Sequence, residues 1–446
     1  MKNHAALRFF LFSLVIFLLA ACRDDDMIIP LSTCPEGDTY ALDYRAGALD
    51  DGYIWLSESD GDVGHEARLS TSPTAGVLQV LNFPEACEET YTVSRAKIPF
   101  ESITDADRVA SSFRITEIAE VPNGSLLDQI TNSPRPEVVI GGAQIEIWGV
   151  PPIEEAELPA QLINSFQHGY NLVEEQRYFA DDSLLVLDVS GLRSAGDAGI
   201  LRLRLSETQE VFGLRMDLGT SFPSVLNFSQ FTPMESRTVD IDWPVFSFDG
   251  LFAIYLVDDF RNQQRTFLGA TPGGSSLTVE IPSATEGVFV AKANWNRSST
   301  TEVEVQYVYD QWPEELILDP VVGGQIDAFN YPEINLDISL ADIIMLEGEI
   351  DRPSQDQFCS RQYIGPAKVG QQTIVLPDLS PVFVKLGGNL PSLYERVYTE
   401  NSRFSLIHYP AMQGSFAWYL HHIHNRGFSS ENWLETLQYE RVTVEL

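Results

Sequence analysis

The sequence predicts an all-β chain of tandem antiparallel β-sandwich domains, and two observations support this prediction. Apolar and polar residues alternate over many short segments; Ile200–Leu205, for example, places its leucines on one face and Arg202 and Arg204 on the other. Clusters of Gly, Pro, Asn and Asp separate these segments, and long helical periodicity is absent. One-sided alternation is typical of antiparallel sheets with one solvated face, so two such sheets must pack together.

The segments that share this alternation are the expected strands. Two short helices are also expected, at Glu154–Phe166 and at Ser430–Gln438, where Trp433, Leu434 and Leu437 share one face. In chain order the expected strands are Tyr53–Leu56, Leu78–Leu81, Tyr91–Ser94, Gln144–Trp148, Leu184–Val189, Ile200–Leu205, Thr238–Trp243, Leu251–Val257, Leu277–Ile281, Val288–Trp295, Thr301–Tyr309 and Val442–Leu446.

Two parts of the chain echo each other. Asp51–Leu56 leads to Tyr91–Lys97, and Asp249–Leu256 leads similarly to Val288–Lys292. The Asp-Gly pairs lie 249 − 51 = 198 residues apart, so two copies of such a unit would nearly fill the chain; alternatively, sandwich strands simply look alike. The expected boundaries are 1–21 for a leader, 22–33 for a linker, 34–104 and 241–298 for immunoglobulin-like sandwiches, 105–240 for a β-sandwich region and 299–446 for a C-terminal β-rich domain.

The start of the chain is typical of a secretory signal peptide. Lys2 and Arg8 supply a basic start, and the apolar run Phe9–Ala21 has 13 residues, whereas a spanning helix needs about 20. Leu19–Cys22 resembles the bacterial lipobox, in which the cysteine receives a diacylglyceryl group and usually a further acyl chain. The resemblance implies a stable lipid anchor at Cys22. The alternative is an ordinary signal peptide with a chance cysteine.

An acidic cluster follows this cysteine: Arg23, Asp24, Asp25 and Asp26. It resembles the surface-export signal of Bacteroidota lipoproteins, and the strand rhythm of the first segment is similar to their small β-sandwich modules. The resemblance implies a lipid-anchored outer-membrane protein exposed at the cell surface. A solvated acidic linker on a periplasm-facing lipoprotein is the alternative.

Composition limits the partners of this chain. Removing the leader leaves 446 − 21 = 425 residues, which suggests about two to four domains. The formal net charge is −36, and the mature value is −36 − 2 = −38 because the leader holds two bases and no acid. Such a chain repels nucleic acid and anionic lipid, so the lipid must supply the membrane attachment. No cofactor is expected.

The cysteine count indicates one disulfide. With Cys22 committed to lipid, Cys34, Cys87 and Cys359 remain, an odd number in an oxidising compartment. Cys34 and Cys87 lie in the same expected domain, so we predict that they form a disulfide worth roughly 4 kcal/mol in the chain-entropy model. Cys359 is then expected as a buried thiol.

A histidine cluster is the strongest candidate for chemistry. On a strand within His421–His424, His422 and His424 would project from one face about 7 Å apart and share a metal, with His408 approaching from a neighbouring strand. The alternative is a half-buried strand with structural histidines. Glu58–Asp62 similarly allows two interpretations, a hairpin turn around Gly61 or a fragment of a calcium loop.

Motifs of hydrolases, P-loop proteins and dinucleotide-binding enzymes are missing, so we expect no enzyme. Exposed aromatic platforms typical of sugar-binding modules could come from five tryptophans, although aromatic residues also fill sandwich cores. The expected role is non-catalytic binding of a glycan or a protein, for example an outer-membrane transporter. A structural or adhesive scaffold and a metal-binding protein are the alternatives. The five tryptophans are Trp148, Trp295, Trp312, Trp418 and Trp433.

Overall fold

The chain folds into strands almost throughout, so the all-β prediction is confirmed. Within the described part, no helix is both long enough and apolar enough to cross a membrane. The structure is a computed structural model, and it describes residues 39–45, 53–68, 78–84, 86–97, 113–128, 137–152, 160–164, 173–194, 198–205, 210–217, 224–245, 247–259, 264–283, 285, 287–352, 357–380, 396–398, 402–424 and 438–446.

The first unit is a sandwich of seven strands, β1 to β7. β1 pairs antiparallel with β4 and parallel with β7, and in the facing sheet β2 pairs with β3 and β5, and β5 with β6. Alternate residues such as Leu42, Ile54 and Val93 fill the space between the sheets. The bounds are β1 (Tyr40–Arg45), β2 (Tyr53–Ser57), β3 (Val63–Arg68), β4 (Leu78–Phe83), β5 (Thr90–Lys97), β6 (Phe113–Pro122) and β7 (Leu126–Asp128).

The next two units, β8–β14 and β15–β21, repeat this pairing. In each, the first strand pairs antiparallel with the fourth and parallel with the seventh, and the fifth pairs with the second and sixth. The third strand pairs with the second in β15–β21, but with the fourth in β8–β14. The bounds are β8 (Glu137–Trp148), β9 (Gln161–Asn164), β10 (Val173–Phe179), β11 (Leu184–Ser194), β12 (Ala198–Arg204), β13 (Val211–Asp217), β14 (Val225–Asn227), β15 (Thr232–Asp242), β16 (Phe248–Asp259), β17 (Gln264–Pro272), β18 (Ser276–Pro282), β19 (Val288–Ser298), β20 (Thr301–Tyr309) and β21 (Glu315–Ile317).

The fourth unit follows the same plan with one change. β23 pairs with β26, β24 with β25 and β27, and β27 with β28, as the first six strands do elsewhere. β22 pairs antiparallel with β23, on the side where the other units have a parallel seventh strand. The bounds are β22 (Gly323–Asn330), β23 (Glu333–Leu340), β24 (Ile343–Arg352), β25 (Gln357–Pro366), β26 (Gly370–Val375), β27 (Ser402–His408), α4 (Phe416–Tyr419), η9 (Leu420–His424) and β28 (Tyr439–Glu445).

This shared plan explains the sequence echo. The echoing segments form β2 and β5 in the first unit and β16 and β19 in the third, which are the second and fifth strands of each. The sheets are largely antiparallel. The parallel pairs are β1 with β7, β8 with β14, β15 with β21, and β25 with β6. The helix predicted at Glu154–Phe166 is wrong for the described residues Gln161–Asn164, because they form the strand β9. Residues 430–437 lie outside the described part. The predicted domain boundaries stay a prediction.

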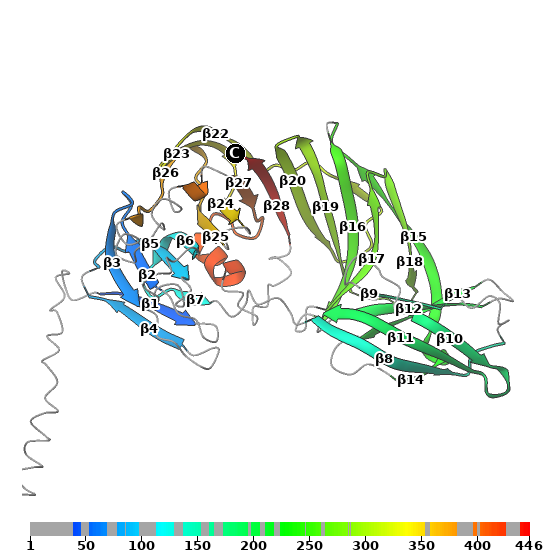
Figure 1. Cartoon of the computed structure of the whole chain (residues 1–446). Coiled ribbons are helices and arrows are strands. Elements are labelled where there is room, and N and C mark those ends of the chain that lie inside the picture. Colours follow the sequence, from blue (N-terminus) through cyan, green and yellow to red (C-terminus); the bar gives the residue numbers. More distant parts are fainter. Residues whose placement is uncertain are drawn as a thin grey trace, which may run out of the picture.

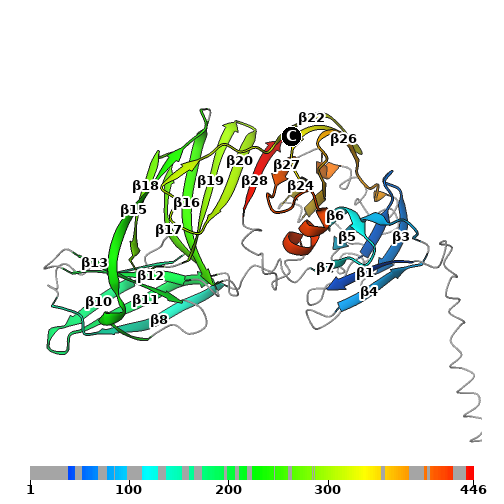
Figure 2. The same cartoon turned by 180° about the vertical axis from the view of Figure 1, so that it is seen from behind.

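Pairing between units joins the lobes of the molecule. β20 pairs with β28 and β25 pairs with β6, so sheets from the third, fourth and first units form one sheet of 12 strands. Figures 1 and 2 show this sheet bridging a lobe made of β8–β21 and a lobe in which β1–β7 lie beside β22–β28. The first and last parts of the described chain therefore share a lobe.

Candidate binding cleft

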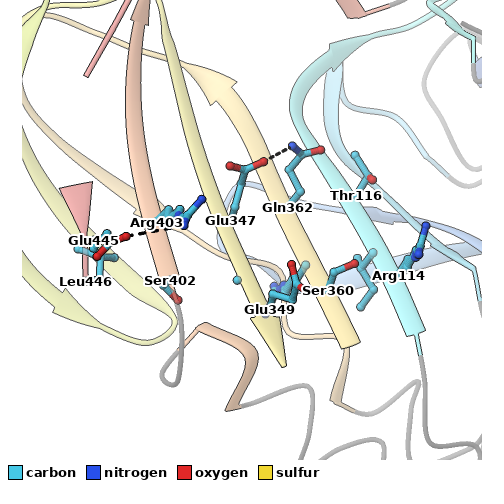
Figure 3. A pocket seen from close by; sticks show the side chains of 13 residues that line it. Arg114, Thr116, Glu347, Glu349, Ser360, Gln362, Ser402, Arg403, Glu445 and Leu446 are labelled. Atoms are coloured by element: carbon cyan, nitrogen blue, oxygen red, sulfur yellow. Dashed lines mark hydrogen bonds and ion pairs between the residues drawn. The ribbon is translucent and has the colours of Figure 1, made fainter. Parts of the chain in front are cut away.

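A polar cleft lies on the 12-stranded sheet where the fourth unit meets the first. It has a volume of about 740 Å³, and β6, β25, β24, β27 and β28, which are neighbours in the sheet, form its floor. Figure 3 shows the labelled side chains lying side by side across these strands. The lining residues are Arg114, Ile115, Thr116, Glu347, Gly348, Glu349, Ser360, Arg361, Gln362, Ser402, Arg403, Glu445 and Leu446.

Strand register places the polar side chains of the floor in rows. Directly opposed residues on neighbouring strands share a face of the sheet. The main row therefore contains hydroxyl, amide, carboxylate and guanidinium groups in alternation: Thr116, Gln362, Glu347, Arg403 and Glu445. A second row contains Arg114, Ser360 and Glu349.

Hydrogen bonds orient the central groups of the floor. Gln362 Nε2 donates to Glu347 at 2.9 Å, and a guanidinium nitrogen of Arg441 donates to the other carboxylate oxygen at 3.3 Å. Arg441 also donates to Ser405 Oγ at 2.9 Å, and a guanidinium nitrogen of Arg403 lies 3.7 Å from Glu445. Glu347 is therefore held by two hydrogen bonds before any ligand arrives, whereas the Arg403–Glu445 pair is exposed and longer than a hydrogen bond.

The charges exposed in the cleft nearly balance. Two arginines and three glutamates project into it, because the side chain of Arg361 points to the opposite face of the sheet and pairs there with Glu117. The net charge of −1 is small beside the formal charge of −36 of the whole chain, so neither a strongly anionic nor a strongly cationic ligand finds a large excess of opposite charge there. The donors and acceptors instead suit a neutral ligand with many hydroxyl groups. The five residues are Arg114, Arg403, Glu347, Glu349 and Glu445.

A buried ion pair lies on the opposite face of this sheet and ties the two units together. Arg361 on β25 donates to both carboxylate oxygens of Glu117 on β6, at 2.8 and 2.7 Å, and both side chains are fully buried. Arg361 Nη1 donates to the hydroxyl of Tyr331, and Nη2, which also binds Glu117, donates to the carbonyl of Pro377. Burial raises the pKa of Glu117, while Arg361 and Tyr398 oppose this rise. The pair fixes the two strands that form one side of the cleft floor.

The histidine cluster lies on a helix instead of a strand. η9 (Leu420–His424) continues α4, and the Ser415 side chain caps the start of that helix. Phe416, Tyr419, Leu420 and Ile423 recur at helical spacing and pack on the core of the first unit, which favours the helix. The strand prediction is therefore wrong for this segment.

This correction removes the geometric reason for pairing His422 with His424, because residues two apart on a helix do not face each other. His408 lies on β27, where its Nδ1 is 2.7 Å from a carboxylate oxygen of Asp342. Within the described residues, no three His, Cys, Asp or Glu side chains are grouped to hold a metal ion. The metal site at His408, His422 and His424 stays a prediction.

Of the four cysteines, the structure describes Cys87 and Cys359. Cys87 is disulfide-bonded. Its predicted partner Cys34 lies outside the described residues, as do Cys22 and residues 23–26, so the pairing and the anchor stay predictions. Cys359 keeps its thiol and is fully buried, as expected.

The acidic segment Glu58–Asp62 forms the hairpin turn between β2 and β3. Gly61 N donates to the carbonyl of Glu58, and Asp60 accepts the backbone N–H of Asp62 at 3.0 Å. The turn interpretation is confirmed.

Of the five tryptophans, Trp295 is buried in the core, while Trp312 and Trp418 are partly buried. Trp433 lies outside the described part. Trp148 alone among the described four is exposed, at 41%.

The cleft residues were missed by the sequence analysis, although a weak signal existed. Polar residues alternate with apolar ones at Arg114 and Thr116, whereas Ser360 and Gln362 flank Arg361 and so break the alternation. This pattern shows that the side chains share a solvated strand face. It does not show which strands are neighbours, and the cleft exists only because these strands pair.

Comparisons with known proteins do not show which family the chain belongs to. No family model matches it, and no curated protein matches it. Among solved structures, a candidate adhesin from Bacteroides ovatus, seen in a crystal structure at 3.00 Å resolution, is similar over 67% of this chain and 94% of its own. The sequence identity is 11% and the TM-score is 0.15, a level at which the likeness supports no argument about fold or function.

Proposed function

We propose that this chain is a non-catalytic, lipid-anchored surface protein that binds a neutral glycan in the cleft. The observation that carries the proposal is the polar row Thr116, Gln362, Glu347, Arg403 and Glu445, whose net charge is only −1 within a strongly acidic chain. Carboxylates accept hydrogen bonds from hydroxyl groups, guanidinium donates them, and amide does both. Because neighbouring strands already orient these groups, a glycan would meet an ordered site and lose less entropy on binding.

The anchor of this proposal rests on the start of the sequence. The lipobox-like segment ending at Cys22 supports lipidation, and Arg23, Asp24, Asp25 and Asp26 support export to the cell surface. A protein held there by acyl chains would present its cleft to polysaccharides of the medium. An outer-membrane protein partner remains compatible with this placement.

A glycan panel tests the binding role. The purified mature lipoprotein in detergent would be titrated against neutral, anionic and cationic oligosaccharides by calorimetry. Neutral glycans should bind best, and Arg403→Ala with Glu347→Ala should weaken binding roughly tenfold, since two central hydrogen-bonding groups are lost. Arg237→Ala is the matched control, because Arg237 forms an exposed ion pair with Glu235 on β15, outside the cleft.

Two outcomes would overturn the proposal. Binding to no neutral glycan would favour the scaffold of spacer domains. Glycan binding that the cleft variants leave unchanged would place the site elsewhere on the chain.

A further inference from the structure

A second surface, remote in sequence from the cleft, carries an ordered row of apolar side chains. Trp148 on β8 is opposite Leu184 on β11, which is opposite Phe179 on β10, so the three side chains lie next to each other across three strands. Trp148 and Phe179 are 41% and 45% exposed. Where side chains are described, these two are the aromatic residues that count as exposed.

Strand alternation explains why this row faces solvent. Ile147, Leu185 and the residues two positions away from them on the same strands point into the core of the second unit and are fully buried. The residues between them must point away from that core. Figure 1 shows β8, β10 and β11 along the bottom of their lobe, with β9, β12 and β13 above them.

Fixed polar groups lie beside the aromatic row. Gln144 Nε2 donates to Asp188 at 2.8 Å, and Arg177 donates to the other oxygen of Asp188 at 3.0 Å. The indole N–H of Trp148 donates to Glu146 at 3.3 Å. The face therefore combines exposed aromatic rings with oriented hydrogen-bonding groups.

Charge and size decide between possible occupants. The face and its adjoining turn carry five acids and one base, so a second copy of the same face or a polyanion would be repelled. A stable protein interface needs about 800 Å² from each partner, with an apolar centre. This row is only three side chains wide and has an acidic rim, so it is too small to form that centre. The acids are Glu146, Glu175, Asp181, Asp182 and Asp188, and the base is Arg177.

We propose that this row is a stacking platform for a neutral glycan chain. The C–H face of a sugar ring packs on an indole or phenyl ring, while its hydroxyl groups reach the carboxylates at the rim. Trp148 and Phe179 lie two strand spacings apart, about 10 Å, so a glycan must extend beyond a single sugar ring to stack on both. The platform shares the ligand class of the proposed function but uses none of the cleft residues.

Oligosaccharides of increasing length test the platform on the full mature protein. Neutral β-glucan and mannan fragments of two, four and six units would be titrated by calorimetry, and the change in tryptophan fluorescence would be compared between the wild type and Trp148→Ala. Affinity should rise from two to four units, and Trp148→Ala with Phe179→Ala should weaken it roughly tenfold for the longer fragments. Val245→Ala, which removes an exposed apolar side chain elsewhere, is the matched control and should leave affinity unchanged.

The outcomes separate this inference from the proposed function. Loss of binding in the platform variant alone supports the platform even if the Arg403 and Glu347 variants have no effect. Equal affinity of the wild-type and platform variants would overturn the platform while leaving the cleft open to support. Self-association that disappears in Trp148→Ala, measured by sedimentation, would assign the face to a second copy and also overturn the inference.

Discussion

Replacing Glu117 by Gln is expected to destabilise the fold by about 3 kcal/mol. Removing one partner of a buried ion pair costs about 3 to 5 kcal/mol, because the other charge is left uncompensated. Arg361 is fully buried, and its two hydrogen bonds to Glu117 measure 2.8 and 2.7 Å. Arg361 keeps bonds to Tyr331 and to the carbonyl of Pro377, so the lower end of the range applies.

Urea unfolding followed by circular dichroism measures this loss as a lower midpoint at an unchanged slope. Glu120→Gln is the matched control, because Glu120 also lies on β6 but pairs with Lys368 at the surface. Exposed pairs contribute about 0 to 1 kcal/mol. The double variant Glu117→Leu with Arg361→Met should recover most of the loss, since no buried charge remains. If Glu117→Gln costs no more than Glu120→Gln, the reasoning is refuted.

Three further predictions concern titration, backbone and anchor. Burial raises the pKa of seven described tyrosines, four of them buried in the core, so stability should fall as pH rises above their ordinary pKa of 10, and tyrosinate absorbance near pH 11 should be lower in the folded than in the urea-unfolded protein. Equal absorbance would contradict this. Gly61→Ala should cost about 1 kcal/mol more than Gly124→Ala in urea unfolding: both glycines have positive φ, but only at Gly61 would a Cβ meet a carbonyl, 3.0 Å away. Similar urea midpoints for the two variants would show that the contact with the carbonyl does not destabilise Gly61→Ala. Cys22→Ser should release or misroute the protein in membrane fractionation, and normal retention would refute the anchor. The four tyrosines buried in the core are Tyr40, Tyr363, Tyr398 and Tyr419.

Strands with one wet face were predictable, and strands that break the alternation were not. Thr238–Asp242 alternates cleanly, with Val239 and Ile241 buried, and forms part of β15. In β24, Ile343, Ile344 and Leu346 are all fully buried, so the strand lacks alternation where both faces are covered. In β6, Glu120 has a φ of 49°, and the register with β5 shifts nearby, which interrupts the period of two.

The helix α4 shows a different reason for failure. Phe416, Tyr419, Leu420 and Ile423 have helical spacing, but the dense aromatic residues around them also fit a half-buried strand. The packing of this apolar face on the core of the first unit decides for the helix. A short apolar run is ambiguous until its packing partner is known.

By itself, the sequence determined the all-β class and many strand positions. These features follow from local alternation and turn residues, which each segment carries within itself. Only the tertiary structure decided the cleft, because Thr116, Glu347 and Arg403 come into one row through the pairing of β6 with β25, of β25 with β24 and of β24 with β27. That pairing depends on backbone hydrogen bonds and on the buried contact of Glu117 with Arg361, between residues 244 positions apart. Local periodicity carries no information about partners at such separation.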